Sequence, residues 1–577
     1  MSAMHASSPA APPVAPVAAP SAAPPDRDGP PLLSVRELTI PLPAEGSDRA
    51  HAVQHVSFDL HEREILCIVG ESGSGKSMIA NAIMGLLPDH LRPDAGRIVF
   101  GGRDLLQAGE PELLDLRGRD IAMVFQEPLS ALNPVMTVGD QILEVMRAHG
   151  AFPGEAGEAR VLAMLDFVGL PDPQVLAGSY PFRLSGGQRQ RVVIAMALAL
   201  EPRLLIADEP TTALDVTTQA QILALIRRIQ RDKGMGVMFV THDFGVVAEI
   251  ADRVAVMERG IIVEQGTADQ VLNAPRHAYT RRLIAAAAPP PADERPRPAA
   301  PPVLQVAGLR KTYRSGHRWS GSRRVVAAVD DVSFEVRRGE TLGIVGESGS
   351  GKSTIGRCLV RLTGTDAGSI AFEGRDITRL TERQFRPLRR HVQMIFQDPF
   401  ASLNPRHTVG RIITAGPLAH GIDAHAATAR ARELLKLVGL EPAAFDRYPG
   451  QFSGGQRQRI GIARALALEP KVLVADEAVS ALDVSVQAQV LELLAGLQRR
   501  LEIALIFITH DLRVAAQICD RIAVMQRGRI VESGPPSQIF DRPQHDYTRL
   551  LIASMPGQHW HGIRQLPAAI EAVQPDE

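Results

Sequence analysis

The octapeptide GESGSGKS occurs twice in this chain of 577 residues, at residues 70–77 and again at residues 346–353. An identical string of this length does not recur by chance, so it marks a long internal repeat. Each copy follows a short apolar run and precedes a helical pattern, where glycines let backbone N–H groups approach a phosphate at the start of a helix. The repeat therefore predicts two phosphate-binding loops. Their residues are Gly70, Glu71, Ser72, Gly73, Ser74, Gly75, Lys76 and Ser77 in the first copy, and Gly346, Glu347, Ser348, Gly349, Ser350, Gly351, Lys352 and Ser353 in the second.

Further short motifs recur in the same order in both halves. After each phosphate loop come a glutamine in VFQEP or IFQDP, the string SGGQRQR, an acidic pair in IADEP or VADEA, and the string THD. The offset between copies is 276 residues at the lysines and 268 residues from the SGGQ strings onward. Because the offset changes only early in the repeat, we infer the duplication of one whole domain. The paired positions are Gln126 and Gln397, Ser185 and Ser453, Asp208 and Asp476, Glu209 and Glu477, and His242 and His510.

Within each copy, short apolar runs alternate with helical patterns, an order typical of an α/β fold built on a largely parallel sheet. In the first half we expect a helix over residues 76–87, with Ile79, Ile83 and Leu86 on one face. The segment between the glutamine and the SGGQ string carries helical spacing and predicts an inserted helical subdomain. The expected buried strands are residues 65–69, 204–207 and 237–240, and the expected helices of the insertion include residues 138–146 and 161–168.

A Pro-rich run separates the two copies and suits an extended linker. The Ala/Pro-rich start of the chain has too few bulky apolar side chains to offset the entropy of ordering, and its prolines interrupt any apolar core that a secretory signal would need. We therefore expect a disordered tail rather than a signal peptide. The predicted organisation is a tail at residues 1–31, a first domain at 32–284, a linker at 285–302, a second domain at 303–556 and a C-terminal tail at 557–577.

Composition excludes several classes of protein. The chain has 63 basic and 64 acidic residues, so no net charge favours nucleic acid or an anionic membrane surface. No apolar stretch approaches the roughly 20 residues that span a bilayer, so no membrane-spanning segment is predicted. The three cysteines are scattered singly, which disfavours disulfides and cysteine-ligated metals and fits a reducing cytosol. Cys67, in a strand pattern, and Cys358, in a helical pattern, are interpreted as small buried side chains.

The repeated motifs supply the groups that nucleotide hydrolysis needs. A lysine at the end of the phosphate loop reaches the β- and γ-phosphates of a nucleotide, and the next serine offers a hydroxyl to Mg²⁺. An aspartate at the carboxyl end of a neighbouring strand can hold Mg²⁺, and the glutamate after it can act as a base or orient water. Taken alone, such an acidic pair is more often a solvated helix start, and a lone histidine after a strand is more often structural. Here all of these occur together, twice.

The string SGGQ by itself is compatible with a simple helix cap. In this order, however, the phosphate loop, the glutamine, the SGGQ signature, the acidic strand, an Ala-Leu-Asp loop and the histidine resemble an ABC transporter ATPase from residue 32 to about residue 556. The resemblance implies that two cassettes pack head to tail, so that each ATP lies between the phosphate loop of one and the signature of the other. It implies signature residues Ser185, Gly186, Gly187, Gln188, Ser453, Gly454, Gly455 and Gln456, and loop aspartates Asp215 and Asp483.

Both composite sites follow residue by residue from this resemblance. Catalysis is assigned to Glu209, His242 and Gln126 in one site and to Glu477, His510 and Gln397 in the other. The cofactors implied are ATP and Mg²⁺, the metal being held by Ser77, Gln126 and Asp208, and by Ser353, Gln397 and Asp476. Because each site keeps its glutamate and histidine, we predict two hydrolytically competent sites.

The two halves depart from the pattern at a few positions. Ala478 stands where the family usually has the proline found at Pro210. Tyr313 is a candidate to stack on adenine, with ordinary core packing as the alternative, and the matching position in the first half is Leu42. These differences predict a slight asymmetry between the two sites.

The segments after each cassette, PRHAYTRRL and PQHDYTRLL, resemble the C-terminal extension of importers for oligopeptides, dipeptides and nickel. Ala278 and Asp546 replace a proline usual in that motif, and the strings ALNP and SLNP after the glutamines also fit the subfamily. Some relatives bind an iron–sulfur cluster through cysteines in this extension. None of the three cysteines lies there, so no cluster is predicted.

The resemblance implies the energy-coupling subunit of an importer of short peptides, dipeptide, oligopeptide or glutathione, with import of nickel or another small solute as the alternative. Its expected partners are two integral-membrane permease subunits and, indirectly, an extracytoplasmic solute-binding protein, at the cytoplasmic face of the bacterial inner membrane. We expect no nucleic-acid partner and an intramolecular dimer of the two ATPase domains.

Other classes of tandem ATPase fit less well. Those that act on the ribosome carry a long charged helical linker, whereas this linker is short and Pro-rich. DNA-repair ATPases need large insertions or zinc-binding cysteines within the cassette, and exporters usually include their own membrane domain. None of these features is visible in the sequence.

Overall fold

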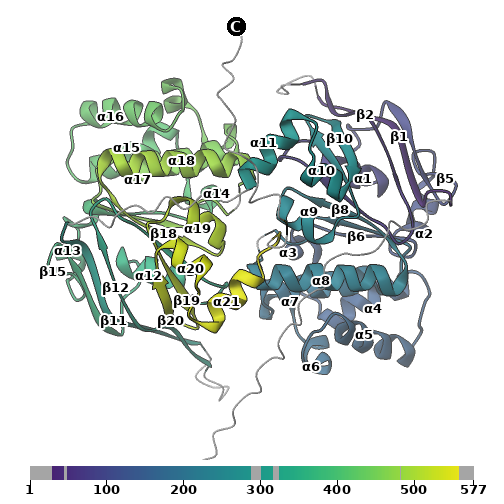
Figure 1. The fold of residues 1–577 in the computed structure, drawn as a ribbon, viewed down its shortest axis with the longest axis horizontal. Helices are drawn as coiled ribbons and strands as arrows, with labels where there is room; N and C mark the ends of the chain where they lie inside the picture. Colours follow the sequence, from purple (N-terminus) through teal and green to yellow (C-terminus); the bar gives the residue numbers. More distant parts are fainter. Residues whose placement is uncertain are drawn as a thin grey trace, which may run out of the picture.

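The computed structural model describes residues 29–43, 49–212, 214–287, 300–315, 324–480, 482–557 and 560. The chain forms two halves of the same architecture that lie side by side, the first in purple to teal and the second in green to yellow (Figure 1). The residues predicted to be a disordered tail fall mostly outside the described part of the chain, as do most of the linker and of the C-terminal tail.

Each half is built on a six-stranded sheet in which five strands are parallel and one edge strand is antiparallel. The order is β10-β9-β3-β8-β7-β6 in the first half and β16-β17-β18-β13-β19-β20 in the second. The predicted α/β fold with a largely parallel sheet is thus confirmed. The strands are β3 (Ile65–Val69), β6 (Ile121–Val124), β7 (Leu204–Asp208), β8 (Gly236–Thr241), β9 (Arg253–Glu258) and β10 (Ile261–Thr267), then β13 (Thr341–Val345), β16 (Val392–Ile395), β17 (Val472–Asp476), β18 (Ala504–Thr509), β19 (Arg521–Gln526) and β20 (Arg529–Gly534).

A second, antiparallel sheet of four strands accompanies each core sheet, in the orders β2-β1-β4-β5 and β12-β11-β14-β15. The apolar side chains of its long strands pack against the phosphate-loop helix and one face of the core sheet. These strands are β1 (Leu33–Pro41), β2 (His51–Leu60), β4 (Ala95–Phe100), β5 (Arg103–Asp104), β11 (Pro302–Ser315), β12 (Arg324–Arg337), β14 (Ala367–Phe372) and β15 (Arg375–Asp376).

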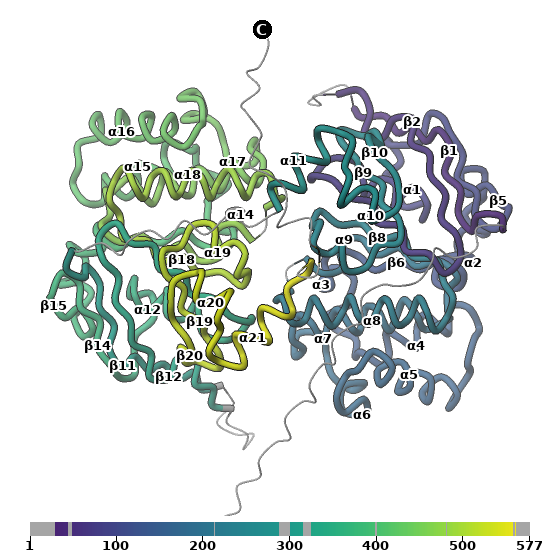
Figure 2. Tube along the Cα trace, viewed as in Figure 1, coloured from purple at the N-terminus to yellow at the C-terminus, as the bar shows by residue number. Residues whose placement is uncertain are grey.

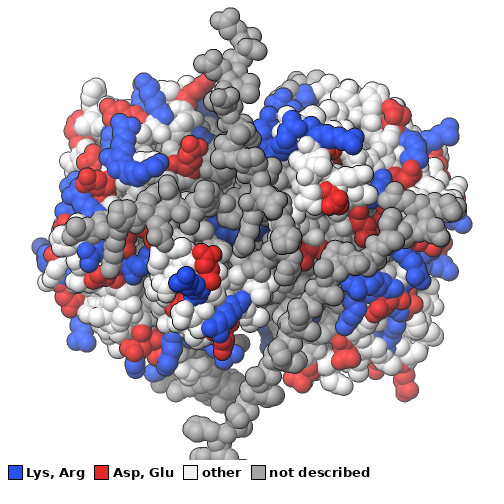
Figure 3. Space-filling model, in the orientation of Figure 1, with Lys and Arg blue, Asp and Glu red and all other residues white. Residues whose placement is uncertain are grey.

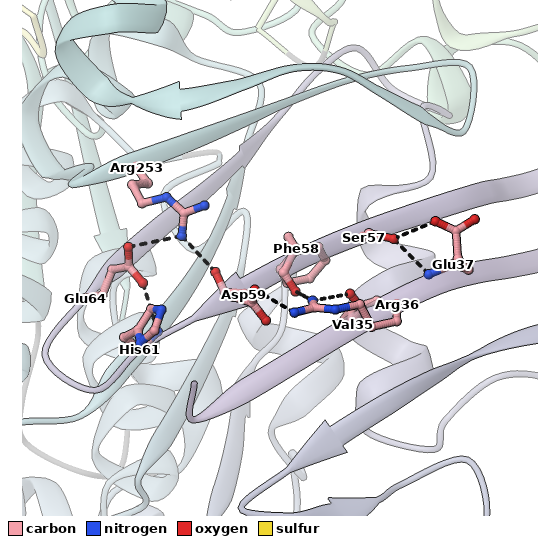
Figure 4. A network of polar contacts seen from close by, with 9 residues as sticks. All are labelled: Val35, Arg36, Glu37, Ser57, Phe58, Asp59, His61, Glu64 and Arg253. Atoms are coloured by element: carbon pink, nitrogen blue, oxygen red, sulfur yellow. Dashed lines mark hydrogen bonds and ion pairs between the residues drawn. The ribbon is translucent and has the colours of Figure 1, made fainter. Parts of the chain in front are cut away.

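The side chain of Arg253 connects the two sheets of the first half (Figure 4). Arg253 on β9 donates to the carbonyl of Asp59 on β2 at 2.9 Å and lies 3.3 Å from a carboxylate oxygen of Glu64. The other oxygen of Glu64 accepts from the N–H of His61 at 2.8 Å. In the second half Arg521 lies 3.0 Å from Glu340 in the same role. The start of each phosphate-loop strand is thereby held in place.

The helices follow the predicted pattern, and those between α2 and α7 form the inserted helical subdomain. In the first half they are α1 (Lys76–Ile83), α2 (Glu110–Leu116), α3 (Pro128–Ala131), α4 (Val138–Ala148), α5 (Glu155–Phe167), α6 (Pro173–Ala177), η1 (Pro181–Arg183), α7 (Gly186–Ala197), α8 (Val216–Lys233), α9 (Phe244–Ile250), α10 (Ala268–Asn273) and α11 (Ala278–Ala287). In the second half they are α12 (Lys352–Leu359), α13 (Glu382–Phe385), η2 (Arg389–His391), α14 (Pro399–Ser402), α15 (Val409–Ala419), α16 (Ala424–Leu437), η3 (Pro442–Asp446), η4 (Pro449–Gln451), α17 (Gly454–Leu466), α18 (Val484–Leu501), α19 (Leu512–Ile518), α20 (Pro536–Asp541) and α21 (Asp546–Ala553).

The helix after the first phosphate loop is shorter than predicted. It ends at Ile83 rather than residue 87, because Gly85 adopts a left-handed conformation with φ 63° and the N–H of Leu86 turns back to the carbonyl of Asn81 at 2.8 Å. Ile79 and Ile83 are buried but Leu86 is exposed, so the prediction that the three lie on one face of the helix was wrong for Leu86.

Two expected boundaries also differ from the structure. Helix α11 continues to Ala287, three residues into the expected linker, and β11 already begins at Pro302. At the other end, the expected C-terminal tail starts with residues that pack on the first half. The N–H of Gly557 donates to Glu249 at 3.1 Å, and the buried indole of Trp560 donates to Asn273 at 2.7 Å.

The predicted burial of Cys67 and Cys358 is confirmed. Basic and acidic side chains are interspersed over the face drawn in Figure 3. The three cysteines are buried and unpaired, and burial raises the pKa of the Cys358 thiol to about 11. Among the described helices, none has the length and apolar character needed to cross a membrane.

Candidate active sites

Each phosphate loop lies between a core strand and a helix, as the repeat predicts. Gly73 and Gly75 have φ values of 75° and 104°, which an L side chain rarely adopts. The buried Lys76 folds over the loop, and its Nζ donates to the carbonyls of Gly70 at 2.7 Å and Glu71 at 2.8 Å. Lys352 does the same in the second half, with both distances at 2.7 Å. Burial lowers the pKa of both lysines, although neighbouring carboxylates oppose the shift.

A serine and an aspartate meet at the foot of each loop. Ser77 donates to Asp208 at 3.0 Å, and Ser353 donates to Asp476 at 2.9 Å. Burial raises the pKa of both aspartates, and the serine hydrogen bonds only partly offset that effect. A hydroxyl and a desolvated carboxylate side by side form an oxygen donor set that suits Mg²⁺, which would also compensate the buried negative charge.

The glutamate after each aspartate is held in an unusual backbone conformation. Glu209 and Glu477 both have φ 46°, and their N–H groups donate to the carbonyls of Val240 and Ile508 on the neighbouring strand. A left-handed conformation costs a non-glycine residue about 1 kcal/mol or more, and such strain concentrates at functional sites. It turns each carboxylate away from the sheet toward the glutamine and histidine, a feature that no local sequence signal predicts.

The predicted glutamine, glutamate and histidine of the first half are in contact. Gln126 donates to Glu209 at 3.0 Å, and Nδ1 of His242 lies 3.2 Å from the other carboxylate oxygen. Burial alone would raise the pKa of Glu209 and lower that of His242. Their mutual attraction outweighs burial, so the pKa of Glu209 is lowered and that of His242 is raised. Gln126, which was predicted to hold Mg²⁺ with Ser77 and Asp208, is hydrogen-bonded here to Glu209.

The second half brings together the equivalent glutamine, glutamate and histidine, but its histidine lies farther from the glutamate. Gln397 donates to Glu477 at 2.7 Å, and Nδ1 of His510 lies 3.7 Å from that carboxylate. In the first half the hydroxyl of Thr212 also donates to the Glu209 carboxylate, at 3.0 Å. The equivalent Ser480 donates instead to the backbone carbonyl of Glu477 at 3.1 Å.

Each signature serine begins a helix. Ser185 accepts from the N–H of Gln188 at 3.3 Å, and the Gln188 side chain accepts from the N–H of Ser185 at 3.0 Å, which forms a capping box at the start of α7. Ser453 and Gln456 cap α17 in the same way. Gly187 lets α7 approach α8, because a Cβ there would lie 2.4 Å from the Thr218 methyl group. The signature serines therefore cap their helices, and each capping box engages the N–H groups of the serine and of the glutamine.

Contacts between the halves join the phosphate loop of each to the Ala-Leu-Asp segment of the other. The N–H of Ser72 donates to Asp483 at 3.0 Å. Reciprocally, the hydroxyl of Thr217, two residues after Asp215, donates to Glu347 at 2.7 Å. The expected intramolecular pairing of the two domains is therefore observed, in a head-to-tail orientation.

The aromatic candidate lies at the surface. Tyr313 on β11 is 41% exposed, with Nζ of Lys311 at 5.7 Å from its ring. The alternative that it fills the core is therefore wrong. Leu42 is partly buried and packs at the edge of the first antiparallel sheet.

The sequence did not indicate that the extensions touch the phosphate loops. The hydroxyl of Tyr279 accepts a hydrogen bond from the N–H of Glu71 at 3.2 Å, and Tyr547 accepts from Glu347 at 3.2 Å. The motif histidines His277 and His545 were visible in the sequence, but the contact partners lie about 200 residues away along the chain.

Family models match the chain in two pairs of segments. The model described as ABC transporter matches residues 53–212 and 329–480. The model described as Oligopeptide/dipeptide transporter, C-terminal region, matches residues 263–310 and 531–574.

Similar proteins match nearly the whole chain. A peptidoglycan transport ATP-binding protein of Agrobacterium fabrum is 48% identical over 534 residues, which cover 91% of this chain and 96% of the relative. Glutathione import ATP-binding proteins of Salmonella typhimurium and Escherichia coli are also 48% identical, over 92% and 91% of this chain and 90% and 89% of the relatives. Among solved structures, a dimeric bacterial ABC transporter cassette is 31% identical over 41% of this chain and 98% of its own, with a TM-score of 0.37.

Proposed function

This chain belongs to the ABC transporter family of ATPases, and we propose that its two halves together form two composite ATP sites that drive the import of short peptides. The reciprocal contacts of Ser72 with Asp483 and of Thr217 with Glu347 carry the proposal. Each phosphate loop touches the segment that follows the other half's acidic strand. The signature helix of that other half is therefore the element that would cover bound ATP. Neither half holds a complete site.

In the first site, the phosphate loop binds the ATP phosphates through its N–H groups and Lys76, while Ser453 and Gly455 approach from the second half. The second site uses Lys352, with Ser185 and Gly187 opposite. Tyr313, whose ring is exposed, is the proposed adenine-stacking residue of that site. Ser77 with Asp208, and Ser353 with Asp476, would hold Mg²⁺, which would help to neutralise the charge of the phosphates.

The geometry supports a general-base role for the glutamates. The lowered pKa of Glu209 keeps its carboxylate ionised, so it can accept the proton of a water that attacks the γ-phosphate. Gln126 donates to that carboxylate at 3.0 Å, and the glutamate is free to meet the water once this bond opens. His242, whose pKa is raised, presents a proton donor toward the terminal phosphate. Glu477, Gln397 and His510 take these roles in the second site.

The import of peptides is supported by the two extensions that match the oligopeptide/dipeptide transporter region and by relatives named for glutathione and peptidoglycan transport. The helical insert offers a surface for permease subunits. Leu129, Val135 and Phe182 on it are large apolar side chains left exposed, Val135 at 78%. Two permeases docked there, with a solute-binding protein on the far side, would hold this chain at the cytoplasmic face of the inner membrane.

Uptake by a reconstituted transporter tests this proposal. The chain, its co-expressed permeases and binding protein are placed in vesicles, and labelled dipeptide, glutathione and nickel are offered with ATP. We expect accumulation of dipeptide or glutathione, and none with the Glu209→Gln, Glu477→Gln double variant as matched control. Accumulation of nickel alone, or equal uptake by the double variant, would contradict the proposal.

The single variants test whether the two sites are equivalent. Because both sites keep the same catalytic set, we expect Glu209→Gln and Glu477→Gln to leave steady-state ATPase rates within about two-fold of each other. Residual rates that differ by a factor of ten or more would show that one site is degenerate.

A further inference from the structure

Each C-terminal extension places one tyrosine hydroxyl on the phosphate loop of its own half. Tyr279 and Tyr547 are only 4% and 5% exposed, and both accept the backbone N–H of the second loop residue at the same distance of 3.2 Å. Two halves that differ at many positions keep this contact with the same geometry. The contact joins the region that marks the importer subfamily to the region that binds nucleotide.

A chain of hydrogen bonds fixes the first tyrosine. The carboxylate of Glu264 on β10 accepts the N–H groups of Arg276 at 2.7 Å and His277 at 3.1 Å. Nδ1 of His277 then accepts the N–H of Tyr279 at 3.3 Å, which starts α11 and aims the ring at the loop. The motif histidine therefore helps to fix the position of the motif tyrosine.

The second half repeats this arrangement. Glu532 on β20 accepts the N–H groups of Gln544 at 2.8 Å and His545 at 3.0 Å, and Nδ1 of His545 accepts the N–H of Tyr547 at 3.1 Å. In both halves the acceptor glutamate comes from the antiparallel edge strand of the core sheet. The tyrosine is thus anchored to the same sheet that carries the phosphate loop.

The tyrosine contacts a loop residue that also accepts a hydrogen bond from the phosphate-loop lysine. The carbonyl of Glu71 accepts from Lys76, while its N–H donates to Tyr279. With both backbone groups of Glu71 held, the peptide planes around it cannot rotate freely, and the loop N–H groups that follow it stay oriented toward the phosphate position. A loop set in advance loses less conformational entropy when it binds ATP.

The same helix also reaches the other half. Helix α11 packs against α18 of the second half (Figure 2). Ala286 and Ala287 at its end line a cleft between the halves. A movement of the halves relative to one another would therefore act on the helix that carries Tyr279.

We propose that Tyr279 and Tyr547 are positioning residues that orient the phosphate loops for ATP, so that the extensions set the ATP affinity of the transporter. This inference rests on the proposed ATP sites. The rings are buried and would also contribute to packing, but a packing role needs only the ring. The orienting role needs the hydroxyl oxygen.

The test is removal of the two hydroxyl groups in the full chain with its permeases. We expect Tyr279→Phe, Tyr547→Phe to raise KM for ATP about ten-fold, the equivalent of one lost hydrogen bond worth about 1.4 kcal/mol, with a smaller change in kcat. Binding of a fluorescent ATP analogue should weaken by the same factor. The melting temperature should change little, because phenylalanine keeps the packed ring.

Two outcomes for the tyrosine variant would overturn the inference. A KM within two-fold of the wild-type value would mean that the hydroxyl does not orient the loop. A lower melting temperature with unchanged KM would assign the tyrosines to packing. The Lys76→Ala, Lys352→Ala variant is the control that distinguishes an incorrect tyrosine role from incorrect ATP sites. If it loses ATP binding while the tyrosine variant does not, the tyrosine role alone is wrong, and if it still binds ATP, the sites themselves are wrong.

Discussion

A single arginine at the boundary between the halves offers a measurable test of how they are held together. Nη2 of Arg513 lies 3.0 Å from Asp511 in its own half and 3.2 Å from Asp243 in the other. These aspartates directly follow the two histidines, His510 and His242. The position equivalent to Arg513 in the first half is Gly245, where a Cβ would come within 2.9 Å of the guanidinium and 2.7 Å of the carbonyl of Pro556.

The perturbation is Arg513→Met, which keeps an apolar stem and removes the charge. The arginine side chain is 17% exposed, and the variant leaves two carboxylates facing one another with little water. Removal of one partner from a buried ion pair costs about 3 to 5 kcal/mol, and the remaining exposure argues for the lower end, about 3 kcal/mol. We therefore expect the free energy of unfolding at pH 7 to fall by about that amount.

The loss should depend on pH in a defined direction. Burial alone would raise the pKa of Asp511, but Arg513 outweighs it and the pKa is lowered. A lowered folded-state pKa stabilises the protein above the ordinary aspartate pKa of about 3.9, and this stabilisation is lost as the pH falls through the folded-state value. The difference between wild type and Arg513→Met should thus be full at pH 7 and shrink in acid.

A double-mutant cycle with Asp243→Asn isolates the part that acts between the halves. Asparagine keeps the oxygen that accepts the N–H of Gly245 at 2.8 Å, so the start of α9 stays capped. Urea unfolding followed by circular dichroism should give a coupling energy of about 1 to 3 kcal/mol. If the losses in unfolding free energy of the two single variants add up to that of the double variant within about 0.5 kcal/mol, the ion pair does not hold the halves together.

Three further predictions concern other contacts. Trp560→Ala should lower the free energy of unfolding by about 3 kcal/mol, because the buried indole is lost from the core of the first half, and unchanged urea unfolding would contradict this. The raised pKa of His242 should fall in Glu209→Gln when its titration is followed by NMR. The stabilisation from protonated His242 is full below pH about 6.5 and is lost as the pH rises through the folded-state pKa, so an unchanged titration would disprove the pairing. Gly187→Ala should reduce ATPase activity through the clash with the Thr218 methyl group, and Thr218→Ser should restore it; failure of this rescue would argue against the clash.

The sequence by itself determined the number of domains, the α/β fold and the identity of most groups in each candidate site. These conclusions depend on local patterns. The phosphate-loop string, the alternation of apolar runs with helical spacing, and the acidic pair at a strand end are each recognised from residues that are close together in the sequence. The end of α1 shows the limit of such patterns, because the apolar spacing continues to Leu86 while the left-handed Gly85 ends the helix.

The tertiary structure decided which distant residues meet. The contacts of Ser72 with Asp483 and of Tyr279 with Glu71 join residues 411 and 208 positions apart, and the strained backbone of Glu209 depends on a carbonyl of the adjacent strand. A repeat also suggests symmetry, whereas the packing places Arg513 against Gly245, because only one bulky side chain fits where the two halves meet. Such steric and electrostatic constraints arise only when the chain is folded, so no local pattern carries them.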